Sequence, residues 1–342
     1  GEAGGETDRA LTLTRPDPVG ERGRAPAAVP TRASILLVVN PAASTYSPRL
    51  EAAVARELGG AFAVELVRTE EPGDAIPITR AGAGDGAFAA VAVLGGDGAV
   101  NEVANGLAGS DIPLVPLPAG RTNVLCRSLG LPLDARGAAA ALARAGGRLS
   151  TRRIDLGTVN GRAFTFFSGI GVSATANRRM SGRGTTGRAL GGHLFLYEVL
   201  AVAASYLRDP PRLVLAAEGE EVEIEGISLI AQNGDPLTYL GGRPLPLCEG
   251  AGLETGTLSL AVLRRGSIGA AATITPRIAL GRGPGVLGRE DVESVPRMSR
   301  ARVRSLDGRP LPLEVDGEYV GELGEIVYGI KPRALTVAAP TR

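Results

Sequence analysis

A glycine-rich segment at residues 91–107 joins an apolar run directly to a helical pattern, and it constrains the fold more than any other part of the chain. Residues 91–94 have the pattern of a buried β-strand, residues 95–98 are Gly-Gly-Asp-Gly, and residues 100–107 have helical spacing. Three glycines in four positions let the backbone turn tightly and approach a ligand, and the first free amides of the helix point at the loop. The segment therefore predicts an anion-binding site at a helix N-terminus.

Asp97 lies inside this loop and would by itself repel a phosphate. Its presence predicts either a bridging Mg²⁺ ion or a proton-accepting role toward an attacking hydroxyl. Glu102 follows five residues later, where it is a candidate to orient a neighbouring side chain or to bind metal through water. The alternative is that Gly-Gly-Asp-Gly is an ordinary strand-to-helix turn capped by the aspartate.

A second loop of the same kind occupies residues 114–123, where an apolar strand ends in a Pro/Gly turn that contains Gly120 and is followed by Thr122 and Asn123. Adjacent parallel strands would bring both loops to the carboxyl edge of one sheet, where ligands bind in such folds. Asn40 ends the first predicted strand and Thr69 the second, at the same edge. Four polar sites converging at one edge favour a nucleotide pocket over an isolated turn.

In the first half of the chain, predicted strands alternate with predicted helices. The strands are residues 34–39, 61–69, 89–94 and 112–116, and the helices are residues 49–58, 74–83, 100–107, 122–129 and 135–145. This alternation predicts a parallel sheet covered by helices on both faces.

Beyond residue 153, short alternating or β-branched runs separated by Gly, Pro and Asp predict an antiparallel β-sandwich. The candidate strands are residues 154–159, 162–167, 213–217, 221–224, 227–232, 257–263, 301–305, 313–315 and 318–320, with helices at about 192–208 and 267–280. The predicted fold class is α/β plus all-β: an N-terminal doubly wound nucleotide-binding domain and a C-terminal antiparallel β-sandwich domain.

The predicted organisation has four parts. They are a disordered leader at residues 1–32, an α/β ATP-binding domain at 33–153, a β-sandwich substrate domain at 154–330, and a C-terminal strand and tail at 331–342. The leader has no apolar block of the signal-peptide type, and no stretch reaches the roughly 18 apolar residues that a membrane span needs.

Composition excludes several chemistries. Lys331 is the only lysine and is followed by proline, so a phosphate loop ending in Lys and Ser/Thr is ruled out. His193 is the only histidine, which makes zinc hydrolysis and a Ser-His-Asp triad poor fits. The 37 basic and 36 acidic side chains leave no electrostatic footprint for nucleic acid, and two isolated cysteines favour a reducing cytoplasm.

Six motifs, taken together, resemble one family. Residues 95–107 read G-G-D-G-A-V-N-E-V-A-N-G-L, and residues 118–127 read P-A-G-R-T-N-V-L-C-R. The remaining motifs are Asn40-Pro41, Asp155-Leu156-Gly157, F-S-G-I-G at residues 167–171, and Asp316-Gly317-Glu318. Taken in their order along the chain, these motifs resemble those of the diacylglycerol kinase catalytic-domain family, which includes bacterial lipid kinases and sphingosine kinases. The chain departs from that pattern at Ala99 and Arg121, where the family has threonine, and at Val124, where it has aspartate.

The resemblance implies an ATP site and a carboxylate site. The implied nucleotide-binding residues are Asn40, Thr69, Gly95, Gly96, Gly98, Glu102, Gly120, Thr122 and Asn123. The implied catalytic residues are Asp97, Asp316 and Glu318, which would form a carboxylate cluster around Mg²⁺ with Asp97 and Asp316 as metal ligands. The alternative for Asp316-Gly317 is a simple hairpin turn. The two interpretations are compatible, because a hairpin turn can also carry the residues of a site.

The substrate side is predicted around residues 190–207, a helix that is apolar on most of its circumference. Such a helix is either a core helix or one shared between the core and an apolar ligand. The preceding segment, residues 178–188, holds four arginines and is predicted to be a mobile basic loop that meets anionic head groups. His193 is predicted to be a surface residue at the start of the helix.

These expectations define a transferase of lipid metabolism. It would use ATP and Mg²⁺ to phosphorylate the hydroxyl of a lipid acceptor, diacylglycerol to phosphatidic acid, in phospholipid biosynthesis. It would be cytoplasmic, in peripheral contact with the inner membrane surface and without a nucleic-acid partner; a homodimer is left open. Two alternatives remain: a kinase of a soluble hydroxyl compound, similar to NAD kinase, and a nucleotide-binding regulatory protein with little turnover, suggested by Ala99 and Val124.

Overall fold

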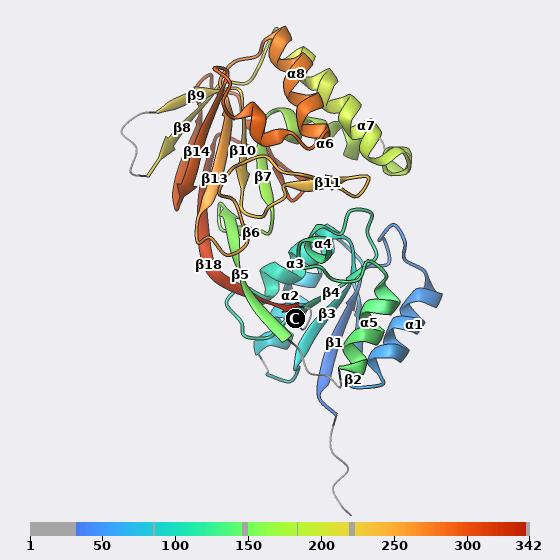
Figure 1. Ribbon diagram of the computed structural model, residues 1–342. Helices are drawn as coiled ribbons and strands as arrows, with labels where there is room; N and C mark the ends of the chain where they lie inside the picture. Colours follow the sequence, from blue (N-terminus) through green and yellow to red (C-terminus); the bar gives the residue numbers. More distant parts are fainter. Residues whose placement is uncertain (1–31, 85, 146–149, 183, 219–222, 340–342) are drawn as a thin grey trace, which may run out of the picture. The chain divides into compact units, whose positions relative to one another are not determined.

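The computed structural model describes residues 32–84, 86–145, 150–182, 184–218 and 223–339, within a compact unit that covers Arg32–Arg342 (Figure 1). The predicted leader falls, apart from Arg32, outside the described residues. The helices are α1 (Pro48–Leu58), α2 (Ala75–Gly84), α3 (Asp97–Leu107), α4 (Val124–Ser128), α5 (Ala135–Arg144), α6 (Val172–Ser181), α7 (Gly184–Ser205), α8 (Ile268–Ala279) and the 3₁₀ helix η1 (Gly283–Val286).

Eighteen strands are described. They are β1 (Ser34–Val39), β2 (Ala63–Arg68), β3 (Ala90–Gly95), β4 (Leu114–Pro118), β5 (Ser150–Val159), β6 (Arg162–Phe164), β7 (Phe167–Ile170), β8 (Leu213–Ala217), β9 (Ile224–Gly226), β10 (Ser228–Gln232), β11 (Thr238–Leu240), β12 (Arg243–Leu245), β13 (Leu258–Leu263), β14 (Val292–Met298), β15 (Arg300–Ser305), β16 (Leu311–Val315), β17 (Glu318–Leu323) and β18 (Glu325–Ala339).

The N-terminal strands form a parallel sheet in the order β2-β1-β3-β4, as the strand–helix alternation predicts. An apolar core lies on each face of this sheet, and successive residues of β1 point alternately into one or the other. Ile35 and Leu37 pack with α1 and α5 on one face, whereas Leu36 and Val38 pack with α2 and α3 on the other. Both faces of the sheet are therefore covered, and the doubly wound domain is confirmed.

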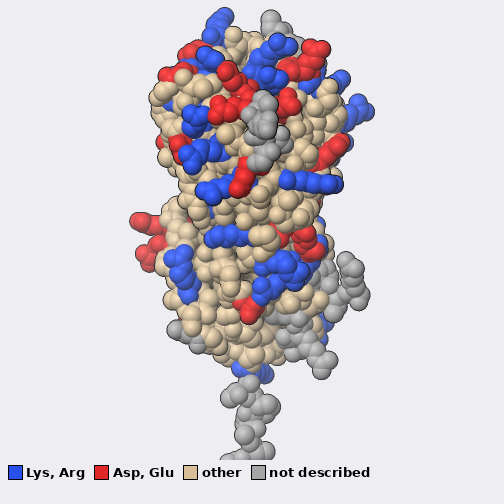
Figure 2. All heavy atoms as spheres, turned by 90° about the vertical axis from the view of Figure 1, so that its left-hand side faces the viewer, with Lys and Arg blue, Asp and Glu red and all other residues tan. Residues whose placement is uncertain are grey.

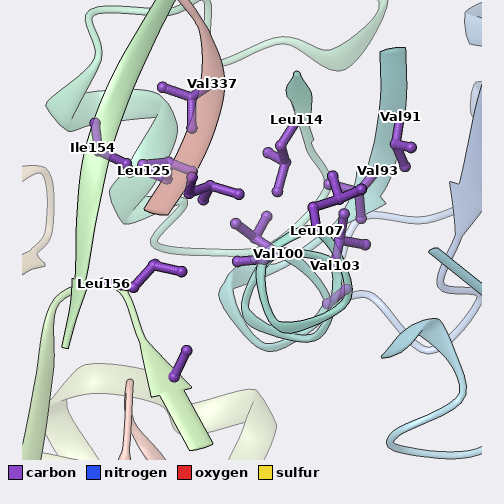
Figure 3. Close-up of a cluster of buried hydrophobic side chains, with 14 of the residues drawn as sticks. Val91, Val93, Val100, Val103, Leu107, Leu114, Leu125, Ile154, Leu156 and Val337 are labelled. Atoms are coloured by element: carbon purple, nitrogen blue, oxygen red, sulfur yellow. The ribbon is translucent and has the colours of Figure 1, made fainter. Parts of the chain in front are cut away.

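Helix α3 is packed more deeply than the other helices of this sheet. Val100, Val103 and Leu107 meet the apolar side chains of β3 and β4 on one side and those of β5 and β18 on the other (Figure 3). A Cβ at Gly106 would lie 1.8 Å from Thr79 Oγ1, so the glycine permits the close approach of α2. The burial fixes the start of α3 and, with it, the glycine loop.

Strand β18 continues the same sheet into the second half of the molecule. Val337 pairs in parallel with Leu114 of β4, while the length of β18 runs antiparallel to β5 and its first residues pair with β15. The resulting ten-stranded sheet contains strands from both halves of the chain. The C-terminal strand therefore pairs with both, and β18 spans the predicted boundary at residue 330.

The second half also contains a six-stranded antiparallel sheet in the order β14-β13-β10-β7-β16-β17. Its inner side chains pack against those of β8, β15 and β18, and the edge of the Phe164 ring meets the Tyr328 ring at a centroid distance of 6.4 Å. The two packed sheets confirm the antiparallel β-sandwich.

Three local predictions in this half are wrong. Residues 178–181 belong to α6, and α7 begins at Gly184, so the predicted basic loop is largely helical. His193 consequently lies inside α7 and not at its start; its side chain is outside the described residues. The single strand predicted at residues 162–167 is two strands, β6 and β7, because the backbone amides between them turn toward Asp316.

The surface carries mixed charge. On the face shown in Figure 2, Arg and Lys side chains are interspersed with Asp and Glu. That face has no basic stripe of the kind that binds nucleic acid. Among the described helices, none combines the length and the apolar character needed to cross a bilayer.

Candidate active site

The four polar sites predicted at strand ends do meet at one edge of the parallel sheet. The Asn40 amide donates to Leu94 O at 3.0 Å, the Thr69 amide to Val39 O at 2.9 Å, and the Ala119 amide to Gly95 O at 2.8 Å. These bonds hold the turns after β1, β2 and β4 against the ends of their neighbours. The convergence predicted from the sequence is confirmed, and the nucleotide-binding role of these residues stays a prediction.

The two glycine loops touch each other through their backbones. A Cβ added to Gly120 would lie 2.6 Å from Gly96 Cα, and a Cβ added to Gly96 would lie 3.3 Å from Gly120 Cα. Gly96 is the N-cap residue of α3 and supplies no side-chain cap, so the first amides of that helix are left to other partners. Gly95 packs equally tightly, because its added Cβ would meet Ala99 Cβ at 2.6 Å.

Asn123 shapes the second loop. Its backbone is left-handed, with φ of 51°, which asparagine tolerates better than most residues. Its Oδ1 accepts from the Gly120 amide at 3.0 Å, and its Nδ2 donates to Gly120 O at 2.7 Å. Thr122 lies beside it and lines the cavity described below.

Asp97 joins the two loops through its carboxylate. Oδ2 accepts from the Asn123 amide at 3.0 Å, and Oδ1 accepts from the Val124 amide at 2.6 Å at the start of α4. Burial raises the pKa of Asp97 to about 6; the two amides oppose this shift and the nearby Asp316 adds to it. A carboxylate offers about four acceptor sites, so Asp97 retains acceptor capacity for a ligand.

Asp316 occupies the β16–β17 turn, whose two central residues have positive φ: 46° for Asp316 and 86° for Gly317. The hairpin turn predicted from Asp-Gly is thus confirmed. The Asp316 carboxylate accepts five hydrogen bonds. The donors are Phe166 N (2.8 Å) and Phe167 N (3.1 Å) to Oδ1, and Thr165 N, Thr165 Oγ1 and Asn101 Nδ2 (each 2.8 Å) to Oδ2.

Asn101 and Asn105 are site residues that the motif analysis did not single out. Asn101 donates from Nδ2 to Asp316 and to Ala163 O, at 2.8 and 3.0 Å. Asn105 donates to Ala163 O at 3.0 Å and accepts from the Ala163 amide at 2.8 Å. They lie four residues apart on one face of α3, and this spacing within N-E-V-A-N was the available signal.

Glu318 lies over the N-terminal turn of α3. A Cβ added to Gly98 would lie 2.0 Å from Glu318 Oε1, and Arg162 forms a 3.7 Å ion pair with Oε2. Desolvation of the carboxylate against the first turn of α3 raises the pKa of Glu318, although 53% of the side chain is exposed; Arg162 opposes this shift, while Glu102 and Asp316 add to it. The described residues give Glu318 no hydrogen bond, so its carboxylate is available to a ligand.

Glu102 has a different environment from the one predicted. It accepts from the Gly73 amide at 2.8 Å and from the Ala75 amide at 3.2 Å, and so caps the N-terminus of α2. Its part in nucleotide binding stays a prediction. Two basic residues of the second loop lie nearby. Arg127 donates to Thr122 O and lies 5.3 Å over the Tyr239 ring, and Arg121 is exposed at the cavity.

The sequence predicts a carboxylate cluster around Mg²⁺ with Asp97 and Asp316 as ligands. Within the described part of the chain, no three His, Cys, Asp or Glu side chains are placed to hold a metal ion, and the pairing of Asp97 with Asp316 on Mg²⁺ stays a prediction. The Asp316 carboxylate is occupied by its five hydrogen-bond donors. A magnesium ion bound mostly by nucleotide phosphates and water needs only one or two protein carboxylates. Glu318 fits that requirement, because the described residues give its carboxylate an ion pair with Arg162 and no hydrogen bond.

A cavity of about 1250 Å³ begins at this carboxylate site. Asp97, Thr122, Asp316 and Gly317 are among its lining residues. Its remaining walls are largely apolar and include Phe195 and Val199 of α7, Leu229 of β10, Leu245 of β12, and Ile274 and Ile278 of α8. The predicted apolar helix thus forms one wall. The cavity exceeds the roughly 300–1,000 Å³ of most small-molecule pockets.

Comparisons with known proteins agree with this architecture. The family model for the diacylglycerol kinase catalytic domain matches residues 34–159. A protein named "Probable lipid kinase YegS-like" from Pseudomonas aeruginosa (strain UCBPP-PA14) is 31% identical over 317 residues, covering 90% of this chain and 94% of that protein. A protein named diacylglycerol kinase from Mycobacterium tuberculosis (strain ATCC 25618 / H37Rv) is 30% identical over 257 residues, 73% of this chain and 77% of that protein.

A solved structure supports the fold. The crystal structure of a diacylglycerol kinase from Bacillus anthracis str. Sterne aligns with a TM-score of 0.63 at 21% identity, covering 90% of this chain and 97% of that one. The fold, the ordered motifs and the near full-length similarity agree, and the chain belongs to the diacylglycerol kinase catalytic-domain family of lipid kinases.

Proposed function

We propose that this chain transfers the γ-phosphoryl group of ATP, with Mg²⁺, to the free hydroxyl of diacylglycerol and so forms phosphatidic acid. The observation that carries the proposal is one cavity with Asp97 at one end and largely apolar walls from α7, β10 and α8 along the rest. A phosphoryl acceptor with long acyl chains matches such a cavity, because its reacting hydroxyl is polar and the remainder is not.

We place the ATP at the carboxyl edge of the parallel sheet formed by β1, β2, β3 and β4. The amides at the start of α3 would receive phosphate oxygens, because Gly96 leaves them uncapped. Asn40, Thr69 and Asn123 border the same edge from the turns after β1, β2 and β4. Mg²⁺ bound to the phosphates would neutralise charge that develops during transfer, and Glu318 would supply its protein ligand.

The phosphoryl transfer needs a proton acceptor at the lipid hydroxyl. The acceptor oxygen would form a bond to the γ-phosphorus as the bond between that phosphorus and the β–γ bridging oxygen breaks, releasing ADP. The hydroxyl proton would pass to Asp97, which lines the cavity and whose pKa of about 6 suits a general base near neutral pH. Asp316, with five donors on its carboxylate, is better suited to positioning the site than to binding metal.

The two alternatives fit less well. A soluble acceptor such as NAD requires a polar cleft. The described residues that line the cavity away from Asp97 and Thr122 are mostly apolar. A regulatory protein without turnover is suggested by Ala99, which removes the family's threonine hydroxyl beside the glycine loop. The cavity itself supports the lipid acceptor.

The test is an acceptor competition. The chain is incubated with Mg²⁺ and γ-labelled ATP together with diacylglycerol, sphingosine, NAD or no acceptor, and the products are separated into organic and aqueous phases. Label that appears in the organic phase only with diacylglycerol supports the proposal. Label in NADP, or no labelled product with any acceptor, overturns it.

A further inference from the structure

The end of helix α8 presents an apolar side chain to solvent. Leu280 directly follows the helix and is 55% exposed, the second most exposed large apolar residue among the described side chains. Pro276, one turn earlier, is also exposed. A protruding leucine at a helix end costs hydration free energy unless something covers it.

Three arginines surround Leu280. Arg277 and Arg282 flank it in sequence and are exposed. Arg243 comes from β12 and is also exposed; a Cβ added to Gly281 would lie only 3.7 Å from Arg243 Cδ, so the hairpin and the helix end are in contact. We call Arg243, Arg277, Leu280 and Arg282 the Leu280 cluster.

No carboxylate lies within ion-pair distance of these three arginines in the described part of the chain. Arginines on either side of this segment do have partners: Arg264 pairs with Glu293, and Arg289 with Asp291. Residues 236–248 and 266–289 contain no Asp or Glu at all. Within the described residues the three arginines are therefore exposed cations without an ion-pair partner, on segments that carry no acidic side chain.

The cluster adjoins the open end of the acceptor cavity. Arg243, Ile278 and Ala279 all line the cavity, and Arg243 is exposed as well, so the cavity reaches solvent beside Leu280. Exposing long acyl chains to water costs free energy. An acceptor with such chains therefore enters the cavity with the smallest free-energy cost when the bilayer touches this opening.

We propose that the Leu280 cluster docks this protein on an anionic membrane surface, with the three arginines on lipid phosphates and Leu280 inserted among the acyl chains. The proposal rests on the proposed function, because the acceptor's residence in a bilayer argues for the occupant. Exposed cations are attracted by anionic headgroups, and one exposed leucine adds apolar contact, so neither component has to be strong alone.

The test measures vesicle binding without nucleotide or acceptor. The full chain is mixed with vesicles of phosphatidylcholine alone or with added phosphatidylglycerol, and bound protein is separated by flotation. The wild type should bind the anionic vesicles and lose binding as salt rises. The variant R243Q/R277Q/R282Q should bind roughly 100-fold less, at about fivefold for each arginine, and Leu280→Ser at least about fivefold less.

The matched controls are R49Q/R56Q/R80Q and Leu133→Ser, which remove three exposed arginines and an exposed leucine (47%) outside the cluster. Control binding equal to wild type, with loss in the cluster variants, supports the proposal. Equal binding by all proteins overturns it, as does a wild-type oligomer that the cluster substitutions dissociate. Phosphorylation of a short-chain, water-soluble diacylglycerol is measured separately: its absence refutes the proposed function, whereas docking is decided by the flotation.

Discussion

Asn101 Nδ2 donates a 2.8 Å hydrogen bond to Asp316 Oδ2, which links helix α3 of the parallel-sheet half to the β16–β17 turn of the sandwich across 215 positions of sequence. Asn101 is 2% exposed, and the same nitrogen also reaches Ala163 O. One buried amide therefore holds the Asp-Gly turn beside the glycine loop. The relative placement of Asp97 and Asp316 depends on this contact.

Removing this link should destabilise the protein. Asn101→Ala leaves acceptors at Asp316 and Ala163 without their shared donor, and Asp316→Asn puts an NH₂ group among N–H donors. Each substitution should lower the free energy of unfolding by about 1–3 kcal/mol in urea titrations. The double variant should lose less than the sum of the two losses, because the bond can be lost only once. Additive losses would show that Asn101 and Asp316 act independently.

Asp97 should set the acid limb of the pH–rate profile. Its pKa of about 6 lies above the ordinary 3.8, and only the ionised form accepts a proton. The value of kcat/KM should therefore be constant above about pH 7, fall to half near pH 6, and drop about tenfold per unit below. Asp97→Asn should reduce turnover roughly 100- to 10,000-fold while the chain remains folded by circular dichroism. A near-normal rate in this variant would remove Asp97 from the chemistry.

Gly120→Ala should lower the catalytic efficiency with ATP by disturbing the contact between the two glycine loops. The added Cβ would lie 2.6 Å from Gly96 Cα, which is a backbone atom of the facing loop and cannot move aside as a flexible side chain would, so the two loops must separate. A displacement of this size should lower kcat/KM for ATP roughly 100-fold. The control is Gly84→Ala at the end of α2, where nothing lies within 4 Å of the added Cβ. It should match the wild type in activity; a comparable loss in both variants would mean that glycine replacement in general is harmful.

Ala203→Phe should shorten the acceptor cavity. Ala203 lines it from α7, whereas its neighbour Ala204 is exposed. With detergent-dispersed substrates, Ala203→Phe should raise the KM for long-chain diacylglycerol and leave the KM for a short-chain analogue and for ATP unchanged. Ala204→Phe adds the same side chain outside the cavity and should change none of these values. An unchanged long-chain KM in Ala203→Phe would place the acyl chains elsewhere.

Glu314 should make stability depend on pH. It is 0% exposed, and burial raises its pKa to about 7; the hydrogen bond from Asn177 Nδ2 opposes this shift. Because the folded-state pKa lies above the ordinary 4.5, the stability that Glu314 contributes is fully present below pH 4.5 and is lost as pH rises through 7. Glu314→Gln cannot ionise, so it should gain on the order of 2 kcal/mol over the wild type between pH 5 and pH 8.

Urea titrations at the two pH values measure this difference. Glu325→Gln serves as the control, because Glu325 is about half exposed and forms only a surface ion pair with Arg302. It should track the wild type at both pH values. If Glu314→Gln also tracks the wild type, the pKa of Glu314 is the same in the folded and the unfolded chain, and burial does not raise it.

Much of the nucleotide side could be predicted from the sequence. Strand, loop and helix follow each other within a few residues around Gly95–Gly98, so local rules for turns and helix starts apply directly. The Asp-Gly hairpin at Asp316 was predictable for the same reason. The helix α6 was missed, because Arg178 and its neighbours have a loop-like composition and its helical state depends on packing against α7 and β16.

By itself, the sequence determined the parallel sheet, its two glycine loops, the sandwich and the family, because each is encoded in short patterns that recur in order along the chain. Only the tertiary structure decided how the carboxylates are used. Glu102 caps α2, Asp316 accepts five hydrogen bonds, and Asp97 and Glu318 keep free acceptor capacity. The physical reason is that hydrogen-bond saturation depends on donors such as Asn101 and Thr165, which lie far from Asp316 in sequence and meet it only in the folded chain.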